Sequence, residues 1–401
     1  MPVDAALARV LEDARPLGPE RLELGACLGR ALAEPLVAPF ALPRFTSSAM
    51  DGYAVHAADT AGASAEAPVG LPVNQRAYAG GGPRTELARG QAARITTGAL
   101  LPAGADAVVP QEETRQWAHD GVAIVRPIVS GQFVRPAGED LEAGEEALPA
   151  GTALGPAELG LAAALGRRDL WVWRRPRVAV VTMGDELIEP GEPLPPGAIY
   201  DANGLALTAA AREAGAEIAG VARAPDDPEA IARAIGSCRG ADLLLTIGGV
   251  SVGDRDHVRP VLEDLGARLD FWRVAMRPGK PLLFGRWEDR PVLGLPGNPV
   301  SALVTFEVFG RPLLRRIGGH RATDRVFVEA ELTAPVDKPS SLTLFCRGRC
   351  DDRRFFPAKK QASNLFTSIA RQDAMAELPP GPARVEAGER IRVRLLPRAA
   401  P

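Results

Sequence analysis

A glycine-rich loop, TIGGVSVGDRD (residues 246–256), is the segment of the sequence best suited to bind an anion. Gly248, Gly249 and Gly253 allow the backbone to approach a ligand closely, and Ser251 adds a hydroxyl donor. The helix predicted to follow would present unpaired N–H groups to the same ligand. The spacing matches neither the G-x-G-x-x-G dinucleotide fingerprint nor a Walker A loop, so the motif predicts an anion without naming it.

Two acids close this loop. Asp254 and Asp256 would repel a phosphate unless a divalent cation lay between them, and this predicts a role for Mg²⁺. The alternative is a tight turn between a strand and a helix beginning near His257, with Asp256 as the helix N-cap. Both interpretations stay open at this point.

A second loop, MGDELIEPGEPLPPGAIYDANG (183–204), follows a predicted buried strand. Ligands bind at the strand exits of open α/β sheets, and a loop of this length is uncommon in a compact domain unless it is functional. Its polar candidates are Glu186, Asp201 and Asn203. A solvated acidic loop is the alternative.

A third element joins two constrained turns, RPGKPLLFGR (277–286) and GLPGNPVSA (294–302). Arg277 and Lys280 place two cations on a proline-stiffened turn, which suits an oxyanion, and the second turn could present backbone groups from fixed positions. The alternative is two loops selected only for shape. The second turn supplies Pro296, Asn298 and Pro299.

Lysine and asparagine are scarce in this chain, which has four of each. Several of them fall within the candidate loops, which adds weight to those loops. The lysines are Lys280, Lys338, Lys359 and Lys360, and the asparagines are Asn74, Asn203, Asn298 and Asn364.

Further candidates lie nearer the two ends. Asp51 occurs in RFTSSAMDGYAV (44–55), where it could equally be the turn residue of an Asp-Gly hairpin. Thr97 and Asp140 stand beside glycine turns. Near the C-terminus, the segment KKQASNLFTSIA and the CRGRC stretch upstream supply Arg347, Ser363 and Ser368.

The pattern of apolar runs, glycines and prolines along the chain predicts several domains of α/β and β type. Short apolar runs separated by Gly and Pro predict an all-β module at 43–140, inserted into a discontinuous helical and β N-terminal domain at 1–42 and 141–174. Alternating buried strands and helical stretches predict a doubly wound α/β domain at 175–318. Alternating strands predict a small C-terminal β domain at 319–401.

Composition excludes several classes of protein. A net charge of −3 gives no electrostatic basis for nucleic-acid binding, and no apolar stretch reaches the length that spans a bilayer. The N-terminus is typical of an amphipathic helix rather than of a signal peptide, so we expect a cytoplasmic protein. Four scattered cysteines and four histidines form no disulfide framework and no zinc site.

Taken together and in order, these motifs resemble those of the molybdopterin molybdenumtransferase family, which includes bacterial MoeA and the E-domain of gephyrin. The resemblance rests on SAMDGYAV, TGALLPAGADAVVPQEE, RPAGED, TMGDEL with IYDANG, TIGGVSVGDRD, RPGKP and GLPGNPVSA. It implies four domains, one of them MogA-like, in an elongated homodimer. It also implies a site between the α/β domain of one subunit and the β module of its partner.

The same resemblance implies the reaction and its residues. Molybdate would enter adenylylated molybdopterin, with release of AMP and help from Mg²⁺. The implied catalytic residues are Asp51, Thr97, Asp140 and Glu186. The implied pterin-substrate residues are Asp201, Asn203, Gly248, Gly249, Ser251, Gly253 and Asp256. The implied molybdate residues are Arg277, Lys280, Pro296, Asn298, Pro299, Arg347, Ser363 and Ser368. The implied metal ligands are Asp51, Asp140 and Asp256.

Two other functions fit parts of the sequence. A molybdopterin adenylyltransferase uses a similar α/β domain but would need only residues 175–318. A non-catalytic dimeric scaffold would need no acids and cations converging on one cleft. Tungstate in place of molybdate also stays open, and transient contacts with an adenylyltransferase and with recipient molybdoenzymes are expected.

Overall fold

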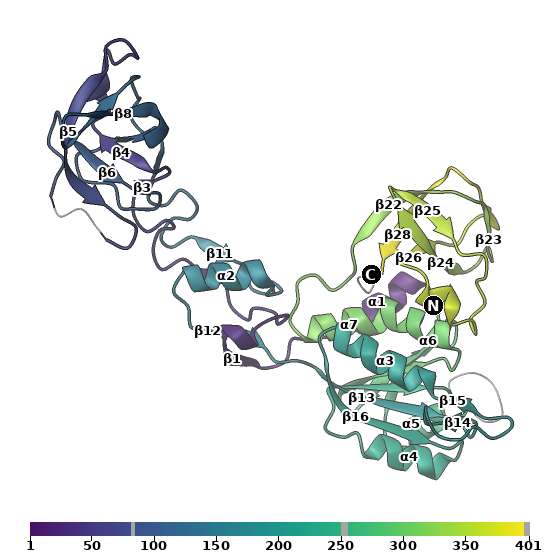
Figure 1. The fold of residues 1–401 in the computed structure, drawn as a ribbon. Coiled ribbons are helices and arrows are strands. Elements are labelled where there is room, and N and C mark those ends of the chain that lie inside the picture. Colours follow the sequence, from purple (N-terminus) through teal and green to yellow (C-terminus); the bar gives the residue numbers. More distant parts are fainter. Residues whose placement is uncertain (82–84, 250–255, 397–401) are drawn as a thin grey trace. The chain divides into compact units, whose positions relative to one another are not determined.

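The computed structural model describes residues 1–81, 85–249 and 256–396, and the chain divides into two compact units (Figure 1). The larger unit consists of Met1–Glu34, Ala150–Leu159 and Arg168–Pro401. The smaller unit consists of Pro35–Pro149 and Gly160–Arg167. Both units are therefore discontinuous in sequence.

A six-stranded mixed sheet forms the centre of the larger unit. Its strands are β13 (Arg177–Met183), β16 (Glu217–Ala224), β17 (Leu243–Ile247), β18 (Arg268–Trp272), β20 (Leu283–Trp287) and β21 (Arg290–Leu295). Their order is β16-β13-β17-β21-β20-β18. The first four pair in parallel, whereas β20 and β18 add two antiparallel strands at one edge. Parallel pairs require crossover connections, which the helices between these strands provide.

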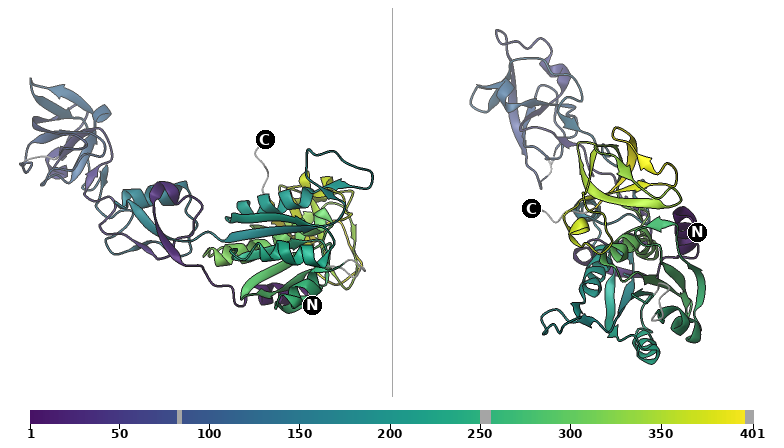
Figure 2. Two further views of the ribbon diagram at one scale, coloured as in Figure 1. Left: turned by 90° about the horizontal axis from the view of Figure 1, so that it is seen from below. Right: turned by 90° about the vertical axis from the view of Figure 1, so that its right-hand side faces the viewer.

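Helices cover both faces of this sheet (Figure 2). They are α1 (Val3–Leu11), α3 (Ala202–Glu213), α4 (Pro228–Gly236), α5 (Val258–Asp264), α6 (Pro299–Thr305), the π-helical η4 (Phe306–Gly310) and α7 (Arg311–Ile317). Successive side chains of a strand point to opposite faces. Val178 and Val180 of β13 therefore share a core with α1, α3, α6, η4 and α7, while Ala179 and Val181 share another with α4 and α5.

The C-terminal part of the chain forms a small closed barrel. Its strands are β22 (Phe327–Leu332), β24 (Thr343–Asp351), β25 (Arg354–Pro357), β26 (Ala374–Leu378) and β28 (Arg390–Leu395). The barrel closes because β24 pairs with both β25 and β26, β22 with β25 and β28, and β26 with β28. Associated elements are β19 (Met276–Arg277), which pairs with β24, the ribbon of β23 (Val336–Asp337) and β27 (Arg384–Val385), and α8 (Thr367–Ala370).

Two short antiparallel pairs join segments that are far apart in the sequence. In the larger unit, β1 (Pro19–Glu23) pairs with β12 (Asp169–Trp173). In the smaller unit, β2 (Leu36–Val37) pairs with β11 (Glu146–Leu148). The helix α2 (Pro156–Ala164) begins at the expected proline, and the 3-10 turn η1 (Leu24–Ala26) follows β1. The domain boundaries themselves stay a prediction.

The smaller unit contains the all-β module. Its sheet has the order β7-β4-β6-β5-β9-β8, and the separate pair of β3 (Ser47–Ser48) with β10 (Val134–Arg135) lies outside that sheet. A core that includes Leu71, Val109 and Ile124 stabilises it. The elements are β4 (Gly52–Val55), η2 (Ala57–Thr60), β5 (Val69–Ala77), β6 (Ala92–Ile95), β7 (Ala107–Pro110), η3 (Gln111–Glu113), β8 (Thr114–Trp117) and β9 (Gly121–Ile124).

The predicted fold class, multidomain α/β plus β with a doubly wound domain, is confirmed. The amphipathic helix expected at the N-terminus is α1, and the strand Pro19–Glu23 follows it. The antiparallel strands β18 and β20 were not predicted, and the segment 277–286, interpreted as a turn, includes the start of β20. Short strands next to prolines and glycines leave little periodicity to detect.

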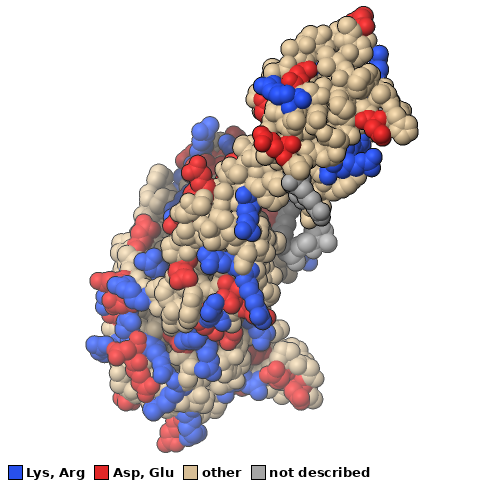
Figure 3. Space-filling view, turned by 90° about the vertical axis from the view of Figure 1, so that its left-hand side faces the viewer, with Lys and Arg blue, Asp and Glu red and all other residues tan. Residues whose placement is uncertain are grey.

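The distribution of charge and the lengths of the helices relate to nucleic-acid binding and to membrane insertion. Acidic and basic side chains are interspersed over the face of the molecule in Figure 3, as expected for a small net charge. Among the residues that the structure describes, no helix is both long and apolar enough to cross a membrane.

A partly buried group of arginines and glutamates ties the α/β domain to the segment that leads into the barrel. Arg325 donates to Glu213 at the end of α3 at 2.6 and 2.9 Å, and to Glu307 of η4 at 2.8 Å. Arg311 donates to Glu213 at 2.8 Å. Burial raises the pKa of Glu213, but the hydrogen bonds and charges of the two arginines outweigh it and lower the pKa overall.

We predict that Arg325→Met lowers the free energy of unfolding by about 2–4 kcal/mol, because two acids then lose a buried partner. Arg384 is the matched control, since its pairs with Asp337 and Glu386 are exposed, and Arg384→Met should cost under about 1 kcal/mol. Chemical denaturation followed by circular dichroism measures both variants. Glu213, whose folded pKa is lowered, stabilises above its ordinary pKa of 4.5 and loses that contribution on acidification. Equal losses of unfolding free energy in the two arginine variants would show that the buried pairs of Arg325 stabilise the fold no more than the exposed pairs of Arg384.

Candidate functional site

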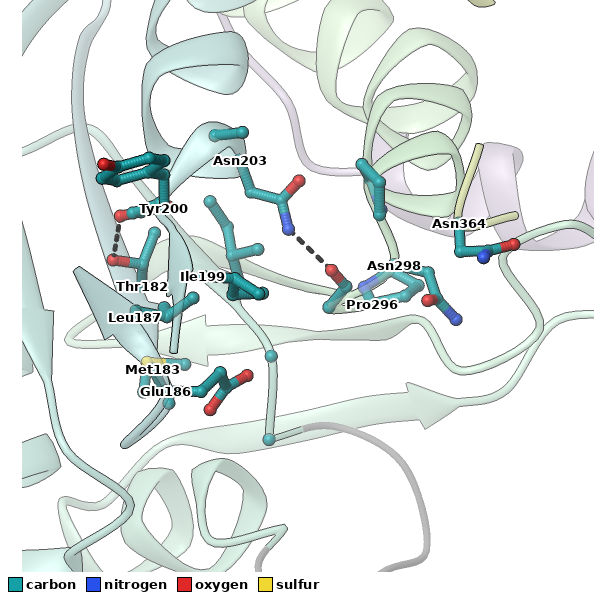
Figure 4. A pocket seen from close by; sticks show the side chains of 18 of the residues that line it. Thr182, Met183, Glu186, Leu187, Ile199, Tyr200, Asn203, Pro296, Asn298 and Asn364 are labelled. Atoms are coloured by element: carbon teal, nitrogen blue, oxygen red, sulfur yellow. Dashed lines mark hydrogen bonds between the residues drawn. The ribbon is translucent and has the colours of Figure 1, made fainter. Parts of the chain in front are cut away.

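A cavity of about 760 Å³ opens in the larger unit where the parallel strands β13, β17 and β21 end (Figure 4). This is the edge at which open α/β sheets bind ligands. The volume is within the range of small-molecule and cofactor sites, about 300–1,000 Å³. The cavity is lined by Thr182, Met183, Gly184, Glu186, Leu187, Ile199, Tyr200, Asp201, Ala202, Asn203, Asp226, Ile247, Gly248, Gly249, Asp256, Pro281, Pro296, Gly297, Asn298, Pro299, Asn364 and Phe366.

The loop after β13 forms one wall. It is held by a short parallel ribbon of β14 (Leu187–Ile188) and β15 (Ile199–Tyr200). Asp201 then caps α3, because its carboxylate accepts hydrogen bonds from the Gly204 amide at 2.9 Å and the Thr182 hydroxyl at 2.7 Å. Of the predicted residues in this loop, Glu186 is exposed in the cavity, whereas the carboxylate of Asp201 is buried and occupied by these bonds.

Asn203 connects two walls of the cavity. Its side-chain amide donates to the carbonyl of Gly297 at 2.6 Å, which ties the start of α3 to the turn after β21 (Figure 4). The predicted Asn203 and Asn298 regions are therefore brought together in the fold, although 94 residues separate Asn203 from Gly297.

The start of the glycine-rich loop forms the floor. Gly248 and Gly249 have φ values of +89° and +62°, and a Cβ at Gly248 would lie 2.9 Å from the Met183 carbonyl. Both positions therefore favour glycine, because the backbone has a positive φ there and, at Gly248, because a side chain would collide with the Met183 carbonyl. Asp256 lines the cavity, but the N-cap position of α5 is His257, without a side-chain cap bond. The predicted Ser251 and Gly253 lie outside the described residues.

The PGNP turn and a loop of the C-terminal barrel meet at the far wall. Pro296, Asn298 and Pro299, which the resemblance assigns to molybdate, line this cavity. Their role as molybdate ligands stays a prediction. The carbonyl of Ser363 accepts a hydrogen bond from the Val300 amide at 3.0 Å, so the barrel loop is fixed to the start of α6.

Several cavity residues were not among the predicted site residues. Asp226 lies just beyond β16, and the strand-exit rule applied to that strand would have found it. Asn364 and Phe366 come from the barrel loop, whose sequence resembles the family only loosely. Tyr200 lies within the long loop 183–204, in which only Glu186, Asp201 and Asn203 were named as candidates.

The electrostatic character of the cavity is acidic. Glu186, Asp226 and Asp256 line it, together with three asparagines, and among the described lining residues there is no lysine or arginine. A phosphorylated ligand would therefore meet repulsion here unless it brought a cation.

The predicted cations lie outside that lining. Arg277, in β19, and Lys280 are exposed, and the Arg277–Pro278 peptide is cis. Arg347 is fully buried: its Nη1 donates to the Phe345 carbonyl at 3.1 Å and its Nη2 to the Ser368 hydroxyl at 3.4 Å. Its Nε has no hydrogen-bond partner within the part of the chain that the structure describes.

The environment of Arg347 disfavours its positive charge. Burial, and secondarily the charge of Arg277, lower the pKa of Arg347 to about 10. It therefore remains a cation at neutral pH. Arg277, Arg347 and Ser368 are thus brought near one another by β19, β24 and α8.

The predicted residues of the β module form a separate group. The Asp51 carboxylate accepts hydrogen bonds from the Thr97 amide at 2.6 Å and the Thr97 hydroxyl at 2.9 Å. These bonds, the amide first, lower the pKa of Asp51 and keep it ionised. β4 pairs with β6 and β7, so Asp51 is not the turn of a hairpin with β3. Asp140 is exposed, and its backbone amide donates to Leu42 at 2.9 Å.

Metal ligands are not preassembled in the part of the chain that the structure describes. No group of three or more His, Cys, Asp or Glu side chains is close enough there to hold a metal ion. Mg²⁺ usually binds through one or two carboxylates plus substrate phosphates, and the acids of the cavity fit only that mode.

The fold and the cavity define a multidomain α/β protein with a ligand-sized cavity at the strand exits of its doubly wound sheet. Three family models match the chain. They are the MoeA N-terminal region (residues 1–166), a probable molybdopterin binding domain (179–316) and the MoeA C-terminal region (329–396).

Relatives and solved structures agree with these models. The chain is 40% identical over 392 residues to molybdopterin molybdenumtransferase 2 of Mycobacterium tuberculosis, covering 96% of each chain. It is 38% identical to the molybdopterin molybdenumtransferase of a Nostoc species, covering 94% of this chain and 89% of the relative. A crystal structure of a molybdopterin biosynthesis MoeA protein from Pyrococcus horikoshii matches with a TM-score of 0.86 at 29% identity, covering 98% of this chain and 99% of the other.

The chain belongs to the molybdopterin molybdenumtransferase (MoeA) family. The predictions of that family and of a transferase of molybdenum cofactor biosynthesis are confirmed.

We predict that Asp201→Ala costs about 2 kcal/mol of unfolding free energy, because it removes a helix cap and leaves the buried Thr182 hydroxyl without its acceptor. Asp227→Ala is the matched control. Asp227 caps α4 through the Ala230 amide and is exposed, so its loss should cost about 1 kcal/mol. Urea denaturation of both variants measures the difference. A cost for Asp201→Ala no greater than that for Asp227→Ala would show that the Thr182 bond contributes nothing.

Proposed function

We propose that this chain inserts molybdate into adenylylated molybdopterin and releases AMP, and that the cavity at the strand exits holds the adenylylated pterin. The supporting observation is the cavity itself. Its volume is large enough for such a ligand, and it has apolar and aromatic side chains for the rings and asparagine and carboxylate side chains for the polar edges. The substrate-binding role of Asp201, Asn203, Gly248, Gly249 and Asp256 is part of this proposal, with Asp201 acting through the shape of α3.

We further propose that Mg²⁺ accompanies the substrate. Asp256 in the cavity, and Asp51 and Asp140 in the β module, are the carboxylates assigned to it. The acidic lining supports this, because the phosphoanhydride would otherwise lie among like charges. When bound, the metal spreads the negative charge that develops as the phosphoanhydride breaks.

Molybdate is a tetrahedral dianion and needs cations and N–H or O–H donors. We assign it to the region where Arg277 approaches Arg347, with Lys280 on the same turn and Ser363 and Ser368 as hydroxyl donors. Arg347 supports this, because it is a buried guanidinium that donates to a carbonyl and a hydroxyl rather than to a carboxylate among the described residues. Keeping the acids and the cations on different loops prevents each anion from occupying the other's site.

The rival functions explain less. An adenylyltransferase would need only the α/β domain, and a scaffold would need no acidic cavity. We propose a cytoplasmic homodimer, with transient contacts to an adenylyltransferase and to recipient enzymes. Light scattering tests the dimer: a mass of one chain, 42.2 kDa, would contradict it.

We predict that Asp51→Asn and Asp140→Asn fold normally but leave adenylylated molybdopterin uncleaved, with AMP release at least about 100-fold slower. Asp51 is exposed and bonded to Thr97, so the amide that replaces it fits the same space. Asp59→Asn, on the same module but bonded to Gly90, is the control. AMP is measured by chromatography, and wild-type turnover by either variant would remove that residue from the mechanism.

We predict that Lys280→Ala raises the molybdate concentration needed for half-maximal activity about tenfold or more, because one cation of the oxyanion region is lost. Lys360→Ala, which removes another exposed lysine, should leave this concentration unchanged. The rate of cofactor formation is followed as molybdate is titrated. If Lys280→Ala shows an unchanged requirement, the oxyanion binds elsewhere.

A further inference from the structure

Three of the four asparagines in this chain line one cavity. They are Asn203, Asn298 and Asn364, and the fourth, Asn74, lies on β5 of the other unit. The chain otherwise uses little asparagine, so its concentration at one site indicates that side-chain amides are needed there.

The three amides are not equivalent. That of Asn203 is bonded to the Gly297 carbonyl. Those of Asn298 and Asn364 have no hydrogen-bond partner among the described residues, although Asn298 occupies the N-cap position of α6. Two neutral amides are therefore available to a ligand.

The fold holds these two amides at the same end of the cavity. The bond between the Val300 amide and the Ser363 carbonyl, 3.0 Å, joins the segments that contain them. Gln361 fixes the other end of the barrel loop, because its side chain accepts from the Arg347 amide at 3.0 Å and donates to the Arg347 carbonyl at 2.7 Å. In Figure 4, Asn298 and Asn364 lie together, and Glu186 lies toward the opposite end.

The chemistry of an amide selects between the two rings of the substrate. An asparagine offers one donor and one acceptor side by side, which matches the N6 amino group and N7 of adenine. The pyrimidine end of a pterin instead presents two neighbouring donors, which a carboxylate accepts better, and the carboxylates line the same cavity elsewhere. Phe366, half-buried beside Asn364 in sequence, provides an aromatic face for a purine.

We infer that Asn298 and Asn364 bind the adenine edge of the adenylyl group and make the enzyme specific for adenylylated, rather than otherwise nucleotidylated, pterin. This inference rests on the proposed function. It assigns a specificity role to the C-terminal barrel, which supplies Asn364 to a cavity of the α/β domain.

The test is calorimetric titration of the purified chain with AMP and with IMP, in which a carbonyl replaces the amino group. We expect the wild type to bind AMP more tightly than IMP. Asn364→Ala should bind AMP about tenfold more weakly, and the double variant Asn298→Ala/Asn364→Ala should bind the two nucleotides equally. Asn74→Ala, which removes the remaining asparagine, is the control and should behave as the wild type.

Equal wild-type affinities for AMP and IMP, or wild-type AMP affinity in both asparagine variants, would overturn the inference. Melting temperatures establish that the variants fold, and Asn364 is exposed, so its replacement leaves the core intact. Turnover of adenylylated molybdopterin by the wild type is measured separately. Turnover with unchanged nucleotide binding in the variants would reject this inference alone, whereas absence of turnover would reject the proposed function.

Discussion

The central strands of the α/β domain are buried on both faces, and this constraint determines where the polar residues lie. On β13, Val178 and Val180 face one helical layer while Ala179 and Val181 face the other, so the strand has no free side for chemistry. β17 is buried throughout. Polar side chains can reach solvent only where these strands end. Because the strands are parallel, their ends meet at one edge, and the cavity lies there.

The same constraint accounts for the glycines and asparagines of the site. Gly248 lies so close to the Met183 carbonyl that no side chain fits, because two strand exits meet at that point. Asn203 spans from α3 to the turn after β21 for the same reason. The barrel adds a loop, fixed to α6 through Ser363, and so completes a wall that the α/β domain alone lacks. The cavity is therefore a product of two domains of the same compact unit.

Charge is distributed between loops rather than mixed within one pocket. The described lining of the cavity has carboxylates and amides, whereas the buried Arg347 belongs to the barrel strand β24, and Arg277 and Lys280 belong to β19 and the turn that follows it. Such a division suits a reaction with two anionic substrates, since each can be held without displacing the other. In the β module, Asp51 is kept ionised by two bonds from Thr97, which is the state needed to bind a cation.

Much of this could be predicted from the sequence, and the remainder has identifiable physical reasons. Long buried runs such as residues 177–183 and 243–247 predicted the strands β13 and β17. The strand-exit rule indicated the loop that contains Glu186, the glycine spacing indicated Gly248, and the proline-stiffened turn indicated Asn298, and all three line the cavity. Residues of two-residue strands and of the barrel loop could not be placed, because their positions depend on pairing between distant segments. Asn364 and Phe366 reach the cavity only because the barrel closes. Burial of Arg347 likewise follows from barrel packing and leaves no sign in the local sequence.

Coupled insertion is best tested by the stoichiometry of AMP released to molybdenum cofactor formed, as molybdate and Mg²⁺ are varied independently. We expect one AMP for each cofactor, with release dependent on Mg²⁺ and stimulated by molybdate. AMP release at the same rate without molybdate, or cofactor formation without AMP release, would contradict an enzyme that couples molybdate insertion to cleavage of the adenylylated pterin.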